Sequence, residues 1–534
     1  MGSRLRAALA AVVLLIFLAP TIFLGFREAF AAGEPPGGPD RFALITQNYI
    51  LYKWWLTNWT TNKVVCELEV DHEGLPTGGE IYDTCGNTTY NNWIATKSCG
   101  ETGCYGYYLQ LLSSEPATRK VSVALPPPVV WMTLQGCVPE NSTFRCDTLP
   151  SLILTGEEPV DGEHIINLGG DLNGKPFLCD QICQVDLVPT GDNDLTINFW
   201  AYSSYGDSSE PFQARVRVTP SDDANGHFWY ADVLSGQWRG SPLAAGSLIW
   251  DAFPPVGGTP TWLSTPPQAD DLATSIPYEY LASRLIEHGV VDASSCPDNG
   301  LLEDGTANQC GLELARSAVD DWQNRFDSLI FTTAQATGIP AQLLKNIFAR
   351  ESQFWPGVSK NHPEAGLGQM TKGGADTTLL WNRPFFEQFC ASVFDETICQ
   401  KGYAHISLEQ QEALDDALVK SVDAFCPDCP LGIDIGRAEN SVEVFAETLL
   451  ANTQQAGMIV YNTYGVSPGD AAGYEDLWRF TLVNYNAGPG CLTLAIRETQ
   501  SLSEPLDWQH LSSHFTPVCQ PALDYVNEIA GLTK

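Results

Sequence analysis

One carboxylate, Glu351, lies at the end of an apolar helical stripe in the C-terminal half of the chain. Pro340 can open a helix there, because proline is tolerated in the first turn. Apolar residues then recur at helical spacing at Leu343, Leu344, Ile347 and Phe348, and the same spacing carries Glu351 onto the buried face. Burial disfavours the charged carboxylate and raises its pKa, as a general acid for a glycosidic oxygen requires near neutral pH. Periodicity alone would also fit an ordinary glutamate at a helix end.

Two short motifs accompany this glutamate. Glu351 and Ser352 are followed by Pro356 and then by a glycine turn that begins fifteen residues after the glutamate, at Gly366, Leu367, Gly368 and Gln369. The second motif, Tyr-Asn-Ala-Gly-Pro-Gly, runs from Tyr485 to Gly490. The glycines allow the backbone to approach a ligand closely. Tyrosine hydroxyls and amide side chains are suited to fixing a carboxyl group and sugar hydroxyls.

In their order and separation, these motifs resemble the soluble lytic transglycosylase family, and the resemblance spans residues 337–490. It implies an all-α lysozyme-like domain with Glu351 as the catalytic acid and base. Tyr485 is implied to hydrogen-bond the Glu351 carboxyl. The residues implied to bind substrate are Ser352, Gly366, Gln369, Met370 and Asn486. The resemblance implies no metal and no cofactor.

The family's reaction uses one carboxyl twice. The acid protonates the β-1,4 bond between N-acetylmuramic acid and N-acetylglucosamine, and it then takes a proton from the C6 hydroxyl, which closes a 1,6-anhydro ring. No water is consumed. The expected activity is therefore non-hydrolytic cleavage of peptidoglycan.

The sequence departs from the family in the loop before the glycine turn. Lys360 stands where the family usually has Ser, and Pro363 and Glu364 stand where it has Gly-Ala. Met370 follows the glutamine, whereas the family's Met often precedes it. These changes leave the acid in place and affect the residues expected to contact sugar.

Two other functions are open at this point. A muramidase-type hydrolase on the same fold would more often need a second carboxylate to activate water. Glu364 and Glu447 are the candidates, although each also fits a solvated or structural carboxylate. A non-catalytic, cell-surface glycan-binding protein is the third reading, and the intact Glu351, Gln369 and Tyr485 favour an enzyme over it.

The 534 residues predict a modular protein. Short apolar runs between turn-rich breaks favour a cysteine-rich β domain over 41–150 and an immunoglobulin-like β-sandwich over 151–253. The Pro- and Gly-dense stretch 254–275 is typical of a linker. Helical spacing then predicts one all-α domain over 276–534, with its last helix near residues 522–529.

The N-terminus has the layout of an export signal. Two arginines precede an apolar run from Ala7 to Phe26, and small residues follow up to Ala31. Residues 1–31 are therefore expected to be a signal peptide or, because the run is long, an uncleaved membrane anchor. A secreted or cell-envelope location follows from either reading.

Sixteen cysteines fall in close sequential couples. An even count behind an export signal favours disulfides. Neighbour pairing gives 66–85, 99–104, 137–146, 179–183, 296–310, 390–399, 426–429 and 491–519. Cys426-Pro-Asp-Cys429 has the spacing of half a zinc site, but no second such pair completes four ligands, so a structural disulfide is expected.

The formal net charge is −36, and no basic patch stands out. Phosphate backbones and anionic lipids attract clustered Lys and Arg, so nucleic acid is excluded as an expected partner. A glycan strand is compatible with this composition, and we expect a monomer. The sequence SDDANG, residues 221–226, faintly resembles a calcium loop, but a hairpin turn is the better interpretation because the closing Glu is missing.

Overall fold

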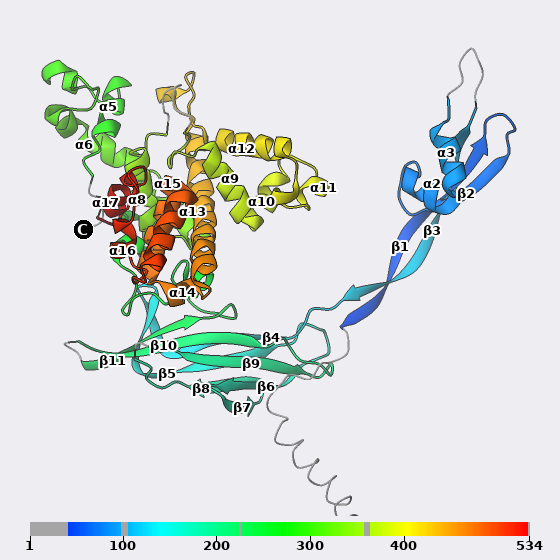
Figure 1. The fold of residues 1–534 in the computed structure, drawn as a ribbon, viewed down its shortest axis with the longest axis horizontal. Helices are drawn as coiled ribbons and strands as arrows, with labels where there is room; N and C mark the ends of the chain where they lie inside the picture. The colour runs from blue at the N-terminus through cyan, green and yellow to red at the C-terminus, as the bar shows by residue number, and fades with distance from the viewer. Residues whose placement is uncertain are drawn as a thin grey trace, which may run out of the picture.

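The computed structural model describes residues 41–97, 105–191, 193–223, 226–274, 276–356 and 364–531. A β-rich N-terminal region precedes a helical C-terminal region, as the sequence predicted (Figure 1). The expected signal segment 1–31, the couple Cys99 and Cys104, and the loop positions Lys360 and Pro363 lie outside the described residues. Among the described residues, no helix is both long and apolar enough to cross a membrane.

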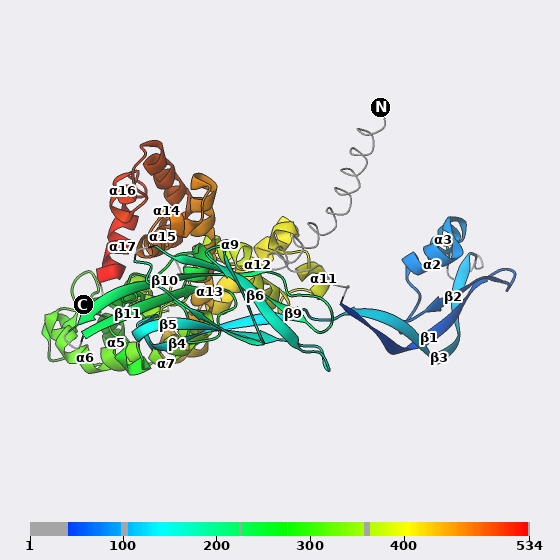
Figure 2. The ribbon, with the colours of Figure 1, turned by 90° about the horizontal axis from the view of Figure 1, so that it is seen from below.

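The first domain is a long antiparallel ribbon that carries a small globular head. Strands β1 (Phe42–Asn58) and β3 (Tyr107–Ala124) pair along their whole length, and β2 (Val64–Val70) adds to β1, giving the order β2-β1-β3. Figure 2 shows the ribbon leading away from the larger sheet to the head. The head adds two short helices that the sequence reading did not predict, α2 (Gly78–Cys85) and α3 (Asn87–Ile94). Their core is small, so the disulfide between Cys66 and Cys85 adds a covalent tie between β2 and α2.

The second domain is one antiparallel sheet of eight strands in two packed layers (Figure 1). Its strands are β4 (Val129–Glu140), β5 (Thr143–Glu157), β6 (Ile165–Leu172), β7 (Lys175–Cys179), β8 (Ile182–Asp186), β9 (Leu195–Ser203), β10 (Phe212–Asp223) and β11 (Gly226–Leu234). They follow the order β4-β5-β11-β10-β9-β6-β7, with β8 on β5. Alternate residues of β9 and the other strands bury their side chains between the layers.

The boundary between the β domains lies earlier than the sequence suggested. Strands β4 and β5 both pair within the second sheet, so that domain begins near Val129 and not near residue 151. Pro126, Pro127 and Pro128 precede it, and prolines cannot donate to a strand ladder. Strands β10 and β11 pair antiparallel on either side of residues 224–225, with Asp223 opposite Gly226.

A buried cluster of charges fixes the base of the ribbon to the sheet. The guanidinium of Arg41 donates to Glu158 at 2.7 and 2.8 Å and to Asp207 at 2.9 Å. Its side chain is 7% exposed, and that of Glu158 is 2% exposed. The bidentate geometry matches a guanidinium to a carboxylate and holds the chain direction at the start of β1.

The third domain is helical throughout its described residues. Its α-helices are α4 (Ser247–Trp250), α5 (Glu279–Glu287), α6 (Gln309–Asn324), α7 (Asp327–Thr337), α8 (Ala341–Glu351), α9 (Lys372–Trp381), α10 (Arg383–Cys390), α11 (Glu396–Cys399), α12 (Leu408–Val422), α13 (Ile435–Tyr464), α14 (Pro468–Ala471), α15 (Tyr474–Ser501), α16 (Trp508–Ser513) and α17 (Pro521–Gly531). Short 3₁₀ turns are η1 (Thr261–Leu263), η2 (Ala269–Asp271), η3 (Pro297–Gly300), η4 (Tyr403–His405) and η5 (Pro430–Gly432). The long helices α13 and α15 pack together, and the other helices surround them (Figure 1).

The segment expected to be a linker is instead part of the helical core. Just before this segment, Trp250 is fully buried, and its indole donates to the carbonyl of Thr453 on α13 at 3.0 Å. Trp262, Leu263 and Leu272 are buried in the same core. The Pro- and Gly-rich composition therefore does not indicate a free tether here, because the large apolar residues between the prolines bind the segment to the helices. We call residues 244–272 the strap.

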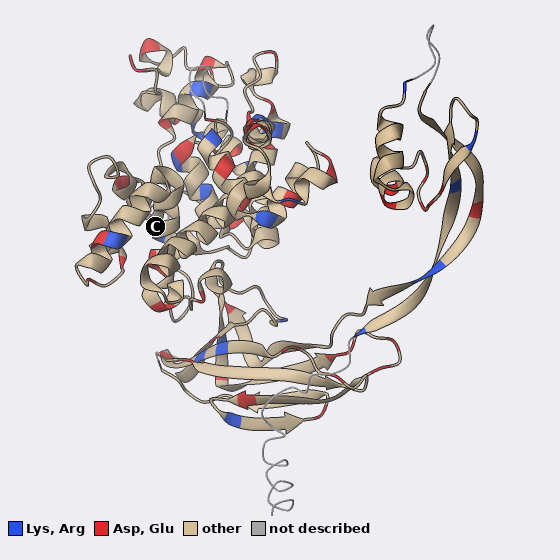
Figure 3. Ribbon diagram, turned by 45° about the vertical axis from the view of Figure 1, so that its right-hand side comes forward, with Lys and Arg blue, Asp and Glu red and all other residues tan. Residues whose placement is uncertain are grey.

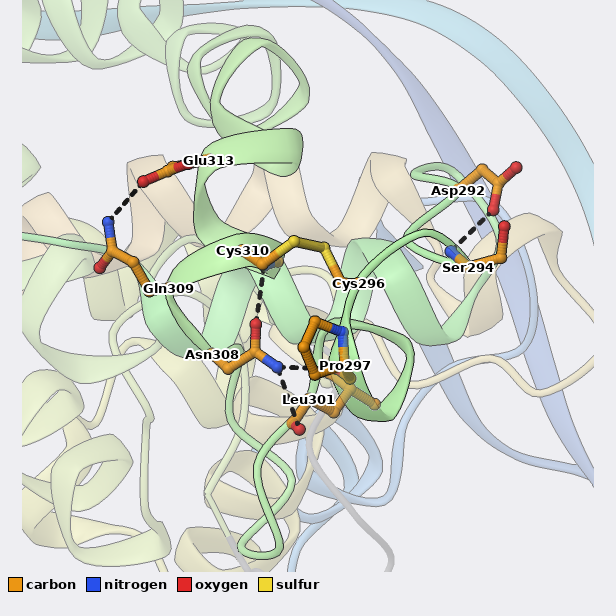
Figure 4. Close-up of a disulfide and its surroundings, with 10 residues drawn as sticks. Asp292, Ser294, Cys296, Pro297, Leu301, Asn308, Gln309, Cys310 and Glu313 are labelled. Atoms are coloured by element: carbon orange, nitrogen blue, oxygen red, sulfur yellow. Dashed lines mark hydrogen bonds between the residues drawn. A yellow bond between two sulfur atoms is a disulfide. The ribbon is translucent and has the colours of Figure 1, made fainter.

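The predicted disulfides form throughout the part of the chain that the structure describes. Seven neighbour pairs are bonded, including Cys426 with Cys429, and no described cysteine is free. Figure 4 shows the bond between Cys296 and Cys310, which ties η3 to the start of α6. Asn308 caps that helix by accepting from the N–H of Gly311 at 2.9 Å, while its amide donates to Pro297. Such bonds are typical of an oxidising, extracytoplasmic compartment.

Charged residues are dispersed. Lys and Arg are seen singly along the elements in Figure 3 and do not gather on one element. Many pair with acids, as Arg215 does with Asp194 and Asp251. No described group of His, Cys, Asp and Glu could hold a metal ion.

Helix α8 is anchored by a buried ion pair. The ammonium of Lys345 donates to both carboxyl oxygens of Asp327 at 2.8 Å, and also to Asn324 and to the strap carbonyl of Leu272 at 3.1 Å. Lys345 is fully buried, and burial raises the pKa of Asp327 to about 6. The pair fixes the rotation and height of α8 against α7 and the strap.

The Lys345→Ala variant should be destabilised by about 3 kcal/mol, because it leaves the carboxylate of Asp327 buried without its partner. Urea unfolding followed by tryptophan fluorescence measures the loss. The exposed ion pair of Lys372 with Asp416 supplies the matched control, and Lys372→Ala should cost no more than about 1 kcal/mol. Equal losses in the two variants would contradict this role for Lys345.

Candidate active site

Glu351 is the last residue of α8, and the backbone after it explains why the helix ends there. Gln353 and Phe354 both adopt left-handed conformations, with φ of 47° and 61°. Such angles are costly for residues other than glycine and need support from their surroundings. The Gln353 amide oxygen accepts from the N–H groups of Tyr280 and Leu281 at the start of α5, and the Phe354 carbonyl accepts from the Trp322 indole at 2.8 Å. These bonds hold the reversal that leaves the carboxyl at the helix end.

The Glu351 carboxyl is mostly removed from water. Burial, the largest effect, raises its pKa to about 7. The nearby negative charge of Glu364 raises the pKa further, while Tyr525 and Arg350 oppose the shift. The Tyr525 hydroxyl donates to Oε1 of Glu351 at 2.6 Å. The carboxyl is thus poised between its acid and base forms at neutral pH.

The donor to Glu351 is Tyr525 of α17, and not Tyr485 as the family resemblance implied. The hydroxyl of Tyr485 donates to the carbonyl of Gly368 in the glycine turn. Tyr485 is partly buried, and removal of its hydroxyl from water and the charge on Glu351 both raise its pKa. The physical reason for the difference is that the buried Gly368 carbonyl needs a donor, and Tyr485 on α15 supplies it.

The glycine turn is a tight loop between Ala365 and Met370, whose backbones exchange hydrogen bonds of 2.9 and 2.7 Å. Gly366 has φ of 75°. A Cβ at Gly368 would lie 2.3 Å from the Phe445 ring, so only glycine fits. Ser352 donates to the Leu367 carbonyl at 2.7 Å and joins the end of α8 to this turn.

The second motif produces a break inside α15. Gly488 has φ of 80° and ψ of 167°, and Pro489 follows it. Proline supplies no N–H, so Pro489 cannot donate a helical hydrogen bond at this position. Asn486 is exposed just before the break. The motif therefore interrupts the helical geometry directly after an exposed amide side chain.

A row of amides lies beside this break. Asn452 donates to the Thr448 carbonyl at 2.8 Å, so its own amide oxygen must accept. Asn484 donates at 2.8 Å to that oxygen and to Gln455. The chain of bonds fixes the orientation of each amide, since a backbone carbonyl can only accept.

These elements enclose a cleft of about 450 Å³. Its lining residues are Glu351, Glu364, Gln369, Met370, Thr371, Gly373, Gly374, Thr377, Phe445, Thr448, Asn452, Asn484, Tyr485, Asn486, Ala487, Gly488 and Pro489. The cleft thus joins the end of α8, the glycine turn, α9, α13 and the break in α15. Hydroxyl and amide groups predominate among its polar atoms, which suits a ligand rich in hydroxyls.

The cleft gathers most of the residues that the sequence singled out. Glu351, Gln369, Met370, Tyr485 and Asn486 all line it. The predicted substrate-binding residues Ser352 and Gly366 are not among its lining residues. Both are buried: Ser352 donates to the Leu367 carbonyl, and a Cβ at Gly366, the first residue of the glycine turn, would meet Ser441 at 2.9 Å.

Of the two further carboxylates considered from the sequence, only one lies in the cleft. Glu364 lines the cleft. Glu447 does not, and it accepts from the Asn382 amide at 2.6 Å at the start of α10. Glu447 therefore has a structural partner, whereas Glu364 shares the cleft with Glu351.

Sequence reasoning missed Tyr525 and the amide row. Tyr525 lies within the helical stripe of Ala522, Val526 and Ile529, so its spacing indicated only a core position. Its contact with Glu351 joins residues 174 positions apart. Only the packing of α17 on α8 brings the hydroxyl to the carboxyl.

The sequence matches no model of a known protein family, and no curated protein matches it significantly. The functional argument therefore depends on the residues of the cleft themselves.

Tyr525→Phe should raise the pKa of Glu351 above about 7, because the variant loses the donor that stabilises the carboxylate. Tyr485→Phe is the matched control and should leave that pKa nearly unchanged, because its hydroxyl donates elsewhere. Carbon NMR of ¹³C-labelled glutamate carboxyls, assigned by the missing signal in Glu351→Gln, measures both. A larger shift in the Tyr485 variant would contradict the geometry.

Glu351 should also make stability depend on pH. The folded chain holds this proton more tightly than the unfolded chain, where the carboxyl titrates near 4.5. Relative to Glu351→Gln, the wild type should therefore lose stability as pH rises from about 4.5 to about 7, by no more than about 3 kcal/mol. Urea unfolding at pH 4 and pH 8 compares the two proteins, and a difference independent of pH would refute the buried titration.

Proposed function

We propose that the chain is an exported enzyme that cuts peptidoglycan glycan strands as a lytic transglycosylase. The observation that carries the proposal is the buried carboxyl of Glu351, with a pKa of about 7, at the wall of a polar cleft. The two sequence motifs border the same cleft. The lysozyme-like description of the helical domain belongs to this proposal, as does the immunoglobulin-like description of the second β domain.

In the proposed first step, protonated Glu351 gives its proton to the glycosidic oxygen between N-acetylmuramic acid and N-acetylglucosamine. The bond from C1 to that oxygen breaks, and positive charge develops at C1. With a pKa of about 7, about half of the Glu351 carboxyls carry the proton at neutral pH. Tyr525 holds the carboxyl in one orientation for this transfer.

In the second step the carboxylate takes a proton from the C6 hydroxyl of the muramic acid. The C6 oxygen bonds to C1 and closes the 1,6-anhydro ring, so the proton returns to Glu351 and no water enters. The amides of Gln369, Asn484 and Asn486 line the cleft where they can hold sugar hydroxyls and acetamido groups.

Hydrolysis is the second candidate, and the position of Glu364 favours it. A second carboxylate in the same cleft could take a proton from water and direct the water to C1. The products then carry a reducing end. A glycan-binding protein without activity is the third candidate, but binding alone does not require the raised pKa of Glu351.

The proposed setting is the cell envelope. The disulfides fit an extracytoplasmic enzyme, and the expected partner is peptidoglycan, with a monomer as the acting species. Cleavage by signal peptidase or retention by an N-terminal anchor would each deliver the chain to that substrate.

Digestion of purified peptidoglycan by the full chain, followed by mass spectrometry, tests the proposal. Wild type should release anhydro-muropeptides, and Glu351→Gln should lose at least 10²-fold in rate, because Gln cannot transfer the proton. The activity of the wild type should fall about tenfold per pH unit above about 7, as the acid form is depleted.

The product masses separate the candidates. Products heavier by one water would replace the transglycosylase by a hydrolase, for which Glu364 would be the candidate base. Failure of the folded wild type to cut any peptidoglycan, with retained binding to it, would favour the non-catalytic reading.

A further inference from the structure

Glu364 has a defined place in the cleft. Its neighbour Ala365 bonds to Met370 through both backbone groups, which fixes the chain where the glycine turn begins. Glu364 itself is half-buried, lines the cleft and raises the pKa of Glu351 through its charge. No described residue forms an ion pair or a hydrogen bond with its side chain. Its charge therefore faces the cleft without compensation from the described residues.

No described cation offsets this charge within the cleft. The lining residues include two glutamates and no Lys, Arg or His. Arg350, next to Glu351 in sequence, pairs with Glu528 and does not line the cleft, although its charge also acts on Glu351 and lowers that pKa. Lys372, beside the lining residue Thr371, pairs with Asp416. The charged side chains that line the cleft are therefore both acidic, Glu351 and Glu364.

We propose that Glu364 makes the cleft select glycan strands without a negative charge on the muramic acid next to the scissile bond. This inference rests on the proposed function. It names the substrate as strands whose lactyl groups are capped in amide linkage by stem peptides. It excludes, as poor substrates, denuded strands whose lactyl groups end in free carboxylates.

The charge on muramic acid depends on whether its lactyl group carries a peptide. The lactyl ether stands on C3 of the sugar whose C1 is cut. An amide-linked peptide makes that group neutral, whereas removal of the peptide leaves a carboxylate. At a separation of several ångströms inside a partly desolvated cleft, two negative charges repel enough to lower binding on the order of tenfold.

Selection of strands by the charge of Glu364 differs from a catalytic role for this residue. A transglycosylase takes its second proton from the C6 hydroxyl through Glu351, so Glu364 has no proton to move. Its charge acts on the substrate at a distance. The effect should therefore shrink when salt screens the field, whereas a general base would act equally at either ionic strength.

Denuded strands provide both substrates for the test. One part is kept with its free lactyl carboxylates, and the other is converted to the neutral methylamide with carbodiimide and methylamine. The two differ in charge at one position and contain no peptide. The measured quantity is the ratio of kcat/KM on the amide to kcat/KM on the carboxylate, so that a general loss of activity cancels.

For the wild type at low salt the ratio should be about tenfold or more, and it should decline at 0.5 M salt. In Glu364→Gln it should fall close to one. Glu443→Gln, which removes an exposed carboxylate of α13 that does not line the cleft, is the matched control and should keep the wild-type ratio.

The outcomes distinguish this inference from the proposed function. A wild type that cuts both substrates equally, or a Glu364→Gln variant with an unchanged ratio, would overturn the selection and leave the transglycosylase standing. Loss of all cleavage in folded Glu364→Gln would instead make Glu364 catalytic and overturn the selection. Absence of cleavage by the wild type on any strand would remove the proposed function and this inference together.

Discussion

The withdrawal of one carboxyl group from water is the constraint on which the rest of the helical domain depends. Glu351 stands at the end of α8, and its burial raises its pKa to about 7. A carboxyl so placed needs a partner, and Tyr525 reaches it from the far end of the chain. The C-terminal helix α17 is therefore as much a part of the candidate active site as the motif residues are.

That position is maintained from both ends of α8. On the inner side Lys345 joins the helix to Asp327 and to the strap. At the C-terminus, two left-handed residues, Gln353 and Phe354, reverse the chain directly after the carboxyl, and their hydrogen bonds to α5 and α6 support the strained backbone. The glycine turn then packs so tightly against Phe445 that Gly368 admits no side chain. Each contact restricts the helix in a different direction.

Local patterns predicted what depends on local physics. Helical spacing located α8 with Glu351 at its end, and neighbouring cysteines predicted all seven described disulfides. The motifs located five residues that line the cleft.

The predictions that were wrong depended on contacts between residues distant in the sequence. Composition marked residues 254–275 as a linker, but Trp262, Leu263 and Leu272 bury that segment in the helical core. The role assigned to Tyr485 belongs geometrically to Tyr525, since only tertiary packing decides which hydroxyl meets the carboxyl. The boundary between the β domains shifted because strand pairing, and not cysteine density, defines a sheet.

The strap also bears on how such a protein can be divided or recombined. Its buried tryptophan, Trp250, packs edge-on against Trp478 of α15, and Arg215 of the second sheet binds Asp251 directly beside it. The helical unit thus completes its interior with residues that lie before its own first long helix. A gene segment that began at the apparent start of the helices would encode an open core. The unit that can be transferred intact between chains must therefore include the strap and begin no later than residue 244, just after the last strand of the sheet.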